Sequence, residues 1–434
     1  MLFCAGITML TSVMAYLLPA WPALRNLVAA AREGSHGSTA SGGQIRARGL
    51  LVSVQVGLSF LLLAGAGLLL RSFYELVNTD SGVQMERVLS MRVNPNWTKI
   101  NTPQKYIELF QSLLDRIRAT PGVMAAGIGN KVPLNQRLPV TRNFLIEGQA
   151  PPDGAPKPVL DLAAVSVGYF ETLRVPVMRG RLFAESDGPD SPRVALVNDI
   201  MAKHYWPQQD PIGRRVSLDN GQQWTTIVGV IPNIKQYSLD TEVGDELYLP
   251  FLQNSSGTNV VVRSALDPGA LAGHLRQAVH GIDPDHAVSA IQTLEEIRQE
   301  SVAPQRLLTL LLTLSSALTL AITIAGIGGV AALSVEQRRS EIGIRVACGA
   351  RPGEIVGLVL RQHLSLVVAG MVAGVAASLA LGRVMSTFLY RTQPTDAVTF
   401  ASVCLLVMAV GAIACGVPAR RASVMDPMKS LRAE

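Results

Sequence analysis

One short polar stretch between two long apolar ones holds the residues best suited to an interaction. Glu341 and Arg345 lie four residues apart with the acid first, which is the favoured order for an ion pair along a helix. Ile342 and Val346 form an apolar strip beside this pair. The pattern predicts protein recognition by a short docking helix that offers charges and an apolar strip to a partner. The simpler interpretation, a solvated connector, stays open.

The limits of this stretch are marked by residues that start and end helices. Residues 334–348 are compatible with one continuous helix, and Gly349 after them is a natural C-cap. Pro352 is typical of a first helical turn and opens the next helix. We therefore expect the segment 334–354 to form a helix and a turn between two longer helices.

The chain lacks the motifs of the common enzyme classes. It has no G-x-x-x-x-G-K-[ST] loop to hold ATP phosphates, no H-E-x-x-H zinc motif and no G-x-S-x-G nucleophile motif. Its four cysteines show no C-x-x-C spacing. Four scattered histidines are expected to be surface or hydrogen-bonded residues and not ligands; they are His204, His274, His280 and His286. We therefore expect no catalytic residue, no metal and no cofactor.

The composition is that of a membrane protein. Hydrophobic residues make up 48% of the 434 residues and charged residues only 16%, against about 25% charged residues in a soluble chain. Spanning a hydrocarbon core of ~30 Å takes roughly 20 apolar residues. Residues 72–304 have no such run, which predicts one large water-facing domain. The stretches without Asp, Glu, Lys, Arg or His that are long enough, or nearly so, are 1–24, 49–70, 307–335, 364–382 and 398–419.

Positive charge near the ends of the spans predicts their orientation. Arginines and lysines gather in residues 25–48, in the polar stretch 336–354 and in the tail 420–434. Placing these three segments in the cytoplasm gives a consistent topology, in which the chain starts outside and residues 72–304 lie outside. The net charge of +6 then reflects this bias and not an affinity for nucleic acid, because no basic patch with interleaved aromatic residues is present.

The chain is expected to divide into six segments. Residues 1–24 would be a first span, and a signal peptide is the alternative. A signal peptide should begin with basic residues, but none precedes Arg25. The residues after this span weakly resemble the end of the chain, which suggests the last span of an earlier copy of the same unit. The segments are a span (1–24), a cytoplasmic linker (25–48), a span (49–71), an extracytoplasmic domain (72–304), a three-span domain (305–419) that contains the cytoplasmic loop 334–354, and a cytoplasmic tail (420–434).

The extracytoplasmic domain is predicted to be mixed α/β and, having no cysteine, to fold without disulfides. Two β-α-β units form a split ferredoxin-like layer, and a β-rich lobe at about 135–253 is inserted between them. Thr102-Pro103 and Asp267-Pro268 mark the starts of the two helices. The predicted strands are Val88–Val93 and Val123–Ile128 in the first unit and Val260–Val262 and Ala287–Ile291 in the second. The fold class is thus a membrane α-helical bundle plus a mixed α/β domain.

The predicted spans favour close packing over ion transport. Their interiors lack ionisable side chains, which normally mark ion or proton pathways in membranes. This counts against a proton- or sodium-driven carrier. Gly370 and Gly374 form a G-x-x-x-G pattern, which allows two helices to approach closely.

Several motifs taken together resemble one family. The stretch 339–350 is similar to the loop motif of the FtsX/MacB-type permeases of ABC transporters, and the match extends from about residue 49 to the C-terminus. The additional first span makes the chain most like the duplicated permeases of that family, in which two such units are fused. The other matched residues are 168–173, 180–181, 197–198, 205–207, 210–213 and 227–230 in the extracytoplasmic domain and 426–432 in the tail.

The resemblance implies a membrane permease that is not itself an enzyme. A separate cytosolic ABC ATPase would push on the loop, and the spans would transmit the movement to the outer domain (mechanotransmission), in export or efflux from the bacterial inner membrane. The family also implies a second permease copy and leaves room for an outer envelope partner. The residues that match the loop motif, and would contact the ATPase, are Glu341, Gly343, Arg345, Gly349 and Ala350.

Two alternatives to transport stay open. The chain could be a non-transporting regulator or scaffold that moves its outer domain to control an envelope partner, or an orphan fragment of a permease without an ATPase. The sequence does not indicate a substrate. For five residues of the family motifs, packing and turns are favoured over substrate contact; these are Tyr169, Phe170, Trp206, Pro207 and Gly213.

Overall fold

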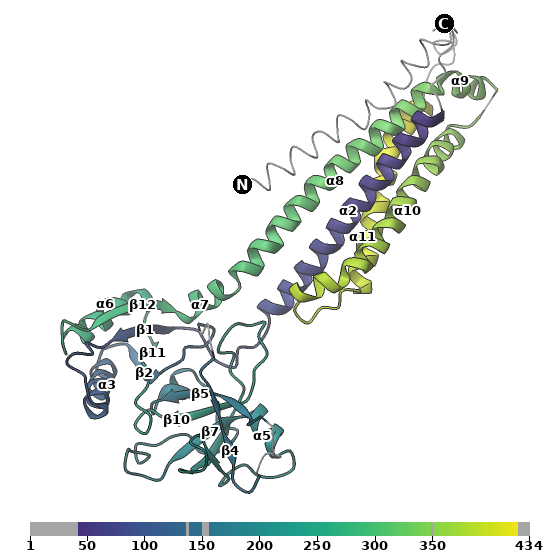
Figure 1. The fold of residues 1–434 in the computed structure, drawn as a ribbon. Coiled ribbons are helices and arrows are strands. Elements are labelled where there is room, and N and C mark those ends of the chain that lie inside the picture. Colours follow the sequence, from purple (N-terminus) through teal and green to yellow (C-terminus); the bar gives the residue numbers. More distant parts are fainter. Residues whose placement is uncertain (1–41, 136–138, 150–155, 349, 424–434) are drawn as a thin grey trace. The chain divides into compact units, whose positions relative to one another are not determined.

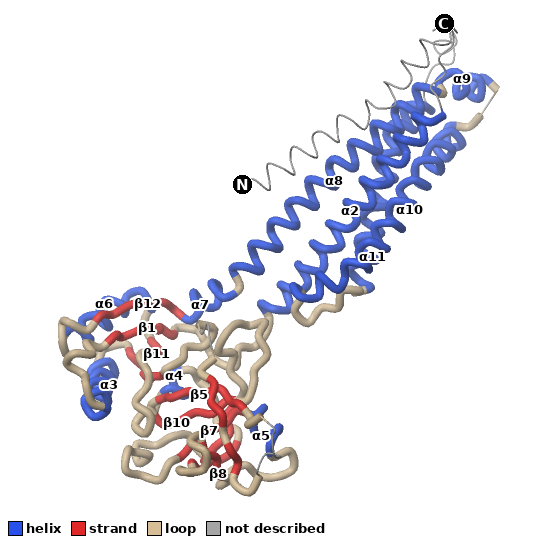
Figure 2. The backbone as a smooth tube through the Cα atoms, viewed as in Figure 1, coloured by secondary structure: helices blue, strands red, loops and turns tan. Residues whose placement is uncertain are grey.

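The computed structural model describes residues 42–135, 139–149, 156–348 and 350–423. The expected first span (1–24), most of the linker after it and the tail from residue 424 lie outside the described residues. The described chain forms two compact units, which we call the helical unit (residues 42–72 and 309–423) and the sheet unit (73–308). The long helices belong to the first and the strands to the second (Figure 2).

The helical unit contains four helices that are long and apolar enough to cross a membrane. In Figure 1, α2, α8, α10 and α11 run alongside one another. Their shared core is built from apolar side chains such as Val56, Phe60 and Val367, which are fully buried. The helices are α2 (Gly42–Val77), α8 (Ala303–Gln337), the short α9 (Arg339–Ala347), α10 (Pro352–Met385), a 3-10 turn η1 (Ser386–Phe388) and α11 (Ala397–Ser423).

The sheet unit holds one mixed sheet of twelve strands in two lobes. The strands follow the order β12-β1-β11-β2-β5-β10-β7-β9-β8-β4, with β3 beside β5 and β6 beside β9. The elements are β1 (Val88–Asn94), α3 (Pro103–Arg118), β2 (Val123–Gly129), β3 (Thr141–Asn143), β4 (Leu145–Ile146), β5 (Val159–Val165), α4 (Tyr169–Thr172), β6 (Arg179–Gly180), β7 (Val194–Asn198), α5 (Asp199–Tyr205), β8 (Arg215–Ser217), β9 (Thr225–Ile231), β10 (Glu246–Pro250), β11 (Asn259–Ser264), α6 (Pro268–His280), β12 (Ala287–Thr293) and α7 (Leu294–Ser301).

The first lobe is the predicted split ferredoxin-like layer. Its strands β12, β1, β11 and β2 are antiparallel neighbours in that order, which is the order that two interleaved β-α-β units produce. Helices α3 and α6 pack against these strands and enclose one hydrophobic core. Phe110, Leu113 and Leu271 are fully buried in that core. The lobe is therefore assembled from the two ends of the sheet unit's sequence.

Both helices of the first lobe begin where the sequence predicts. The Thr102 hydroxyl accepts a hydrogen bond from the Lys105 amide at 3.3 Å, and Pro103 occupies the first turn of α3. The Asp267 carboxylate accepts from the Gly269 amide at 3.1 Å at the start of α6. Such caps satisfy amides that have no partner within the helix, so the helix starts are defined locally.

The second lobe is the inserted segment between β2 and β11. Within the sheet, it joins the first lobe where β5 pairs with β2 at Val165 and Gly129; the Asn130 and Ser166 amides add hydrogen bonds across the same boundary. Its strands mix parallel pairs (β5 with β10, β7 with β9) and antiparallel ones. Its core includes Trp206, Ile227 and Leu247. Parallel neighbours cannot be joined by a tight turn, so long connections link β5 to β10 and β7 to β9.

Candidate functional site

The short helix α9 lies between two membrane-spanning helices and is separated from α8 by a turn at Arg338. The expected continuous helix over 334–348 is therefore interrupted: α8 ends at Gln337 and α9 begins at Arg339. The amide of Arg338 bonds to the Val335 carbonyl at 3.2 Å, a spacing that tightens the end of a helix. The break turns α9 away from the line of α8 (Figure 1).

Glu341 and Arg345 form the predicted ion pair. The guanidinium Nη2 of Arg345 lies 2.7 Å from Oε1 of Glu341, and both side chains are about half exposed (47% and 49%). An exposed pair at this spacing stabilises a helix by only about 0.3–0.5 kcal/mol. The pair therefore adds little to folding and leaves both charged groups accessible to a partner.

Ile342 does not belong to an exposed apolar strip, so that expectation is wrong. Its side chain is 5% exposed and packs in a small core with Val335, Ile355, Val359 and Ala419. The reason is the turn at Arg338, which folds α9 back so that Ile342 faces α8, α10 and α11. Burying one such side chain contributes about 1.5–3 kcal/mol, so Ile342 holds α9 against the membrane helices.

The exposed face of α9 contains a different apolar residue. Ile344 is 53% exposed and Cys348 is also exposed. Together with Glu341 and Arg345 they occupy positions i, i+3, i+4 and i+7, which share one side of a helix. We call these four residues the α9 face. The 3.6-residue period signals this grouping in the sequence once Ile342 is assigned to the core.

Two other residues of the loop motif are less accessible than Glu341 and Arg345. Gly343 is buried, Ala350 is half-buried, and Gly349 lies outside the described residues. The next helix begins at Pro352, as predicted, with the Glu354 carboxylate accepting a hydrogen bond from the Arg351 amide at 3.3 Å. Among the four of these residues that the structure describes, Glu341 and Arg345 are thus the two with exposed side chains.

Helix α2 packs closely against α10 at the glycines that the sequence singles out. A Cβ on Gly370 would lie 2.4 Å from the Ser53 carbonyl oxygen, and one on Gly374 would lie 2.8 Å from the Gly57 carbonyl oxygen. The Ser53 hydroxyl donates to the Leu366 carbonyl at 3.1 Å across the same contact. The G-x-x-x-G pattern therefore serves packing between helices of this chain.

Polar contacts that sequence reasoning missed join α2 to α8. The hydroxyls of Ser59 and Thr323 lie 2.5 Å apart, and Ser316 donates to the Leu62 carbonyl at 2.9 Å. Serine and threonine within spans carry no charge and share no motif, so composition alone did not identify them. These contacts tie α2 to the helix that leads into α9.

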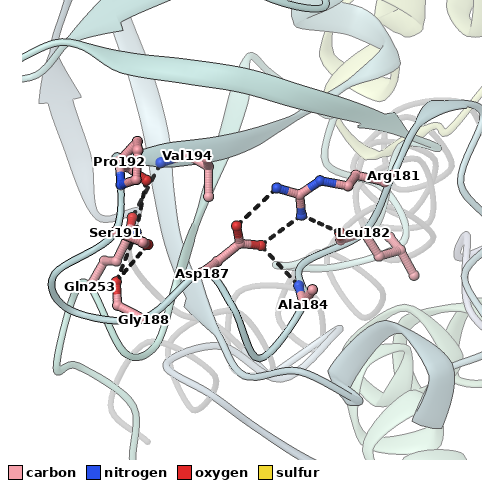
Figure 3. Close-up of polar contacts among 9 residues, drawn as sticks. All are labelled: Arg181, Leu182, Ala184, Asp187, Gly188, Ser191, Pro192, Val194 and Gln253. Carbon is pink, nitrogen blue, oxygen red and sulfur yellow. Dashed lines mark hydrogen bonds and ion pairs between the residues drawn. The ribbon is translucent and has the colours of Figure 1, made fainter.

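A loop of the inserted lobe is fixed by an arginine–carboxylate pair (Figure 3). Arg181 donates to both carboxylate oxygens of Asp187, at 2.7 and 2.9 Å, and the Ala184 amide donates to the same carboxylate at 2.9 Å. The Arg181 guanidinium lowers the pKa of Asp187. Gln253 holds the far side of the loop by donating to the Ser191 hydroxyl at 3.0 Å. This arrangement fixes the shape of the loop.

A buried charge pair lies deeper in the same lobe. Nζ of Lys131 is 2.5 Å from Oδ2 of Asp161, and the two residues are 1% and 9% exposed. The Tyr237 hydroxyl also bonds to Asp161. Such pairs are costly to break, because the remaining charge stays buried without compensation. Nothing in the sequence around Lys131 indicates its burial.

Glu246 lies in the same buried cluster as this pair. It is 3% exposed and accepts a hydrogen bond from the Tyr248 hydroxyl at 2.5 Å. Burial raises the pKa of Glu246 to about 7, although Tyr248 and the Lys131 charge oppose that shift. Gln236 donates to the Tyr248 hydroxyl at 3.0 Å. The cluster therefore changes its charge near neutral pH.

The aromatic residues of the family motifs are structural. Tyr169, Phe170 and Trp206 are 1%, 3% and 3% exposed. The Tyr169 hydroxyl donates to the Lys131 carbonyl at 2.9 Å, and Phe170 packs edge-on against Tyr248. These contacts place them in the core of the sheet unit, as expected.

The arrangement defines a membrane protein with a bundle of spans, a mixed α/β domain and no recognisable reaction centre among the described residues. Two family models match the chain: the MacB-like periplasmic core domain over residues 65–282 and the FtsX-like permease C-terminal domain over residues 313–427. The chain belongs to this MacB/FtsX family of ABC transporter permeases. It is an inner-membrane protein whose sheet unit is the extracytoplasmic domain. The arginines around α9 predict that this end of the helices is cytoplasmic.

Curated relatives are about a quarter identical to this chain over the residues that align. The pyoverdine export ATP-binding/permease protein PvdT of Pseudomonas aeruginosa is 27% identical over 280 residues, which is 61% of this chain and 41% of that protein. The uncharacterized ABC transporter permease YknZ of Bacillus subtilis is 27% identical over 285 residues, 62% of this chain and 69% of that protein. The chain thus spans about two fifths of the length of the pyoverdine-export relatives.

Solved structures of extracytoplasmic domains align with this chain only loosely. The periplasmic region of MacB from Actinobacillus actinomycetemcomitans has a TM-score of 0.35 at 12% identity, covering 52% of this chain and 97% of that one. The extracellular domain of the transporter YknZ from Gram-positive bacteria has a TM-score of 0.30 at 15% identity, covering 47% and 100%. The family assignment therefore rests on the sequence models.

Proposed function

We propose that this chain is the permease subunit of an ABC-type exporter and that a separate cytosolic ATPase drives it by binding the α9 face. The observation that carries the proposal is the geometry of α9. Ile342 fixes the helix to α8, α10 and α11, while Glu341, Ile344 and Arg345 stay exposed at the cytoplasmic end. A helix that packs against the membrane helices on one side and is exposed on the other can bind a partner and transmit the partner's movement to those helices.

The path from α9 to the outside follows from the chain itself. The turn at Arg338 connects α9 to α8, and α8 is tied to α2 through Ser59 and Thr323. Both α2 and α8 continue directly into the sheet unit. Movement of α9 would thus reach the extracytoplasmic domain through two helices, and the permease itself would catalyse no reaction.

The identity of the cargo and of further partners is also a proposal. The relatives' names supply pyoverdine as the first compound to test. We further propose that two permease copies work as a pair and that the extracytoplasmic domain meets an outer envelope partner. Regulation of such a partner without transport would also act through α9. Transport therefore has to be measured separately from ATPase binding.

The test is co-purification with, and stimulation of, a candidate ATPase encoded beside this chain. The double exchange E341R/R345E keeps an ion pair on α9 and reverses the order of its charges, so recruitment is expected to fall at least tenfold. R420E reverses a charge at the end of α11, outside the α9 face, and serves as the control. Undiminished recruitment and stimulation by the double variant would refute the docking assignment.

Transport is distinguished from regulation in proteoliposomes that hold the permease and the ATPase. ATP-dependent efflux of a defined compound supports export. ATP-dependent activation of an envelope enzyme without any flux would contradict export and support regulation. The proposed binding of the ATPase to α9 would be unaffected by that result.

A further inference from the structure

The cytoplasmic end of the helical unit contains a pocket of about 340 Å³ between α2, α8 and α10. We call it the inner pocket. Its polar lining residues are Arg48, Ser334, Gln337, Arg338, Gln362 and His363. None of the described residues that line it is acidic. The pocket is thus a basic hollow with several hydrogen-bond donors, and the α9 face does not include any of its lining residues.

Part of the lining of the inner pocket is apolar, and we call this part its apolar wall. Val330, Leu333 and Leu366 line it, and Leu366 belongs to the charge-free stretch 364–382. Arg48 opens the apolar part of α2, and Arg338 directly follows that of α8. The pocket therefore lies where the hydrocarbon part of the bundle meets its cytoplasmic end, with its cations at the polar side.

The polar groups of the inner pocket are held in place. Nη1 of Arg338 donates to Oε1 of Gln362 at 3.1 Å, which fixes the guanidinium between α8 and α10. His363 is 5% exposed, and its Nδ1 bonds to the Val359 carbonyl at 2.9 Å. That bond leaves Nε2 for another partner. Arg48 has no acidic partner among the described residues.

We infer that the inner pocket binds the phosphate of an anionic phospholipid from the inner leaflet. Two guanidinium groups supply planar donors that match phosphate oxygens, and the His363 ring and Gln337 amide add further polar contacts. The apolar wall would receive the first carbons of the acyl chains. Basic pockets between spans on the cytoplasmic side are a recurrent form of headgroup recognition.

The inference concerns a site apart from α9 and does not depend on the proposed ATPase contact. Because the lipid would bridge α2, α8 and α10 at their cytoplasmic ends, it would brace the helices that hold α9. A soluble phosphate would satisfy the same cations without using the apolar wall, which is how the two sources can be separated.

The test is lipid binding by the purified, delipidated full chain in a neutral detergent. Fluorescent phosphatidylglycerol and phosphatidylcholine with the same acyl chains are titrated in parallel, and we expect phosphatidylglycerol to bind at least tenfold more tightly. R48Q and R338Q should each weaken phosphatidylglycerol binding about fivefold. R351Q and R420Q remove arginines at the same membrane end that do not line the pocket, and should leave binding unchanged.

Competition on the wild-type chain makes the test independent of variant folding. Short-chain phosphatidylglycerol should displace the probe far better than inorganic phosphate. Equal displacement by inorganic phosphate would make this a soluble-anion site and overturn the inference. Equal affinity for phosphatidylcholine, or equal losses in R338Q and R351Q, would also overturn it.

Discussion

The backbone of Ser53 on α2 lies so close to Gly370 on α10 that a Cβ at position 370 would be 2.4 Å from the Ser53 carbonyl oxygen. Such a distance is not available to any other residue type without moving one helix. The contact joins the span that leads into the extracytoplasmic domain to the span that follows α9. In the proposed mechanism, a movement of α10 would therefore reach α2 through this contact.

Replacing this glycine should loosen the bundle. We expect G370L to separate α2 from α10 and to cost about 1–3 kcal/mol, as overpacking of a tight core does. The measurement is the thermal unfolding of the purified chain in detergent. The control is G357A in the same helix, because nothing lies within 4 Å of a Cβ at Gly357; alanine there should be neutral or slightly stabilising. Equal Tm values for G370L and the wild type would contradict the close contact.

The buried pair in the inserted lobe predicts a non-additive response. K131M leaves Asp161 buried without its cation, and D161N leaves Lys131 without its anion, so each should destabilise the lobe by about 3–5 kcal/mol. The double variant K131M/D161N should cost less than the sum of the two. Hydrogen exchange of the β5 and β10 amides in the full chain measures these losses, and strict additivity would argue against the pair.

Glu246 predicts a pH dependence of the same lobe. Burial raises its pKa from 4.5 to about 7, so between these values the folded lobe keeps a proton that the unfolded chain has released. The free energy of opening should therefore fall as pH rises from 4.5 to 7 and level off above, by a total on the order of 3 kcal/mol.

The variant E246Q isolates this contribution. It stays uncharged at every pH, so the loss of stability between pH 5 and 7 should shrink in hydrogen exchange of β10. E242Q, at an exposed position of the adjoining loop, should behave like the wild type. A wild type and an E246Q variant with parallel pH profiles would show that Glu246 is not the titrating group.

The sequence predicts most of the fold because its signals are local. The caps at Thr102 and Asp267, the charge-free spans and the β-α-β order are all properties of short segments. The class of the membrane bundle and the ferredoxin-like layer follow from them. The break at Arg338 does not, because no glycine or proline marks it and the residues on both sides favour helix.

The sequence predicts the charged pair of the candidate site but not which apolar residues are exposed, because exposure depends on contacts between distant segments. The spacing of Glu341 and Arg345 identifies an exposed pair, but an apolar residue such as Ile342 or Ile344 can face either a partner or the chain's own core. Only the packing of Ile342 against Val335 and Ile355 decides between them. The pair Lys131–Asp161 joins residues distant in sequence, so it had no local signal at all.

The most direct test of the account uses Cys348, the exposed native cysteine of the α9 face. The full chain is assembled with its candidate ATPase in inverted membrane vesicles and treated with a membrane-impermeant maleimide. Without the ATPase, Cys348 should react from the cytoplasmic side, and C348S identifies its share of the labelling. With the ATPase bound, labelling of Cys348 should fall at least fivefold. Unchanged labelling in the presence of bound, active ATPase would contradict the proposal that the ATPase drives the permease by binding α9.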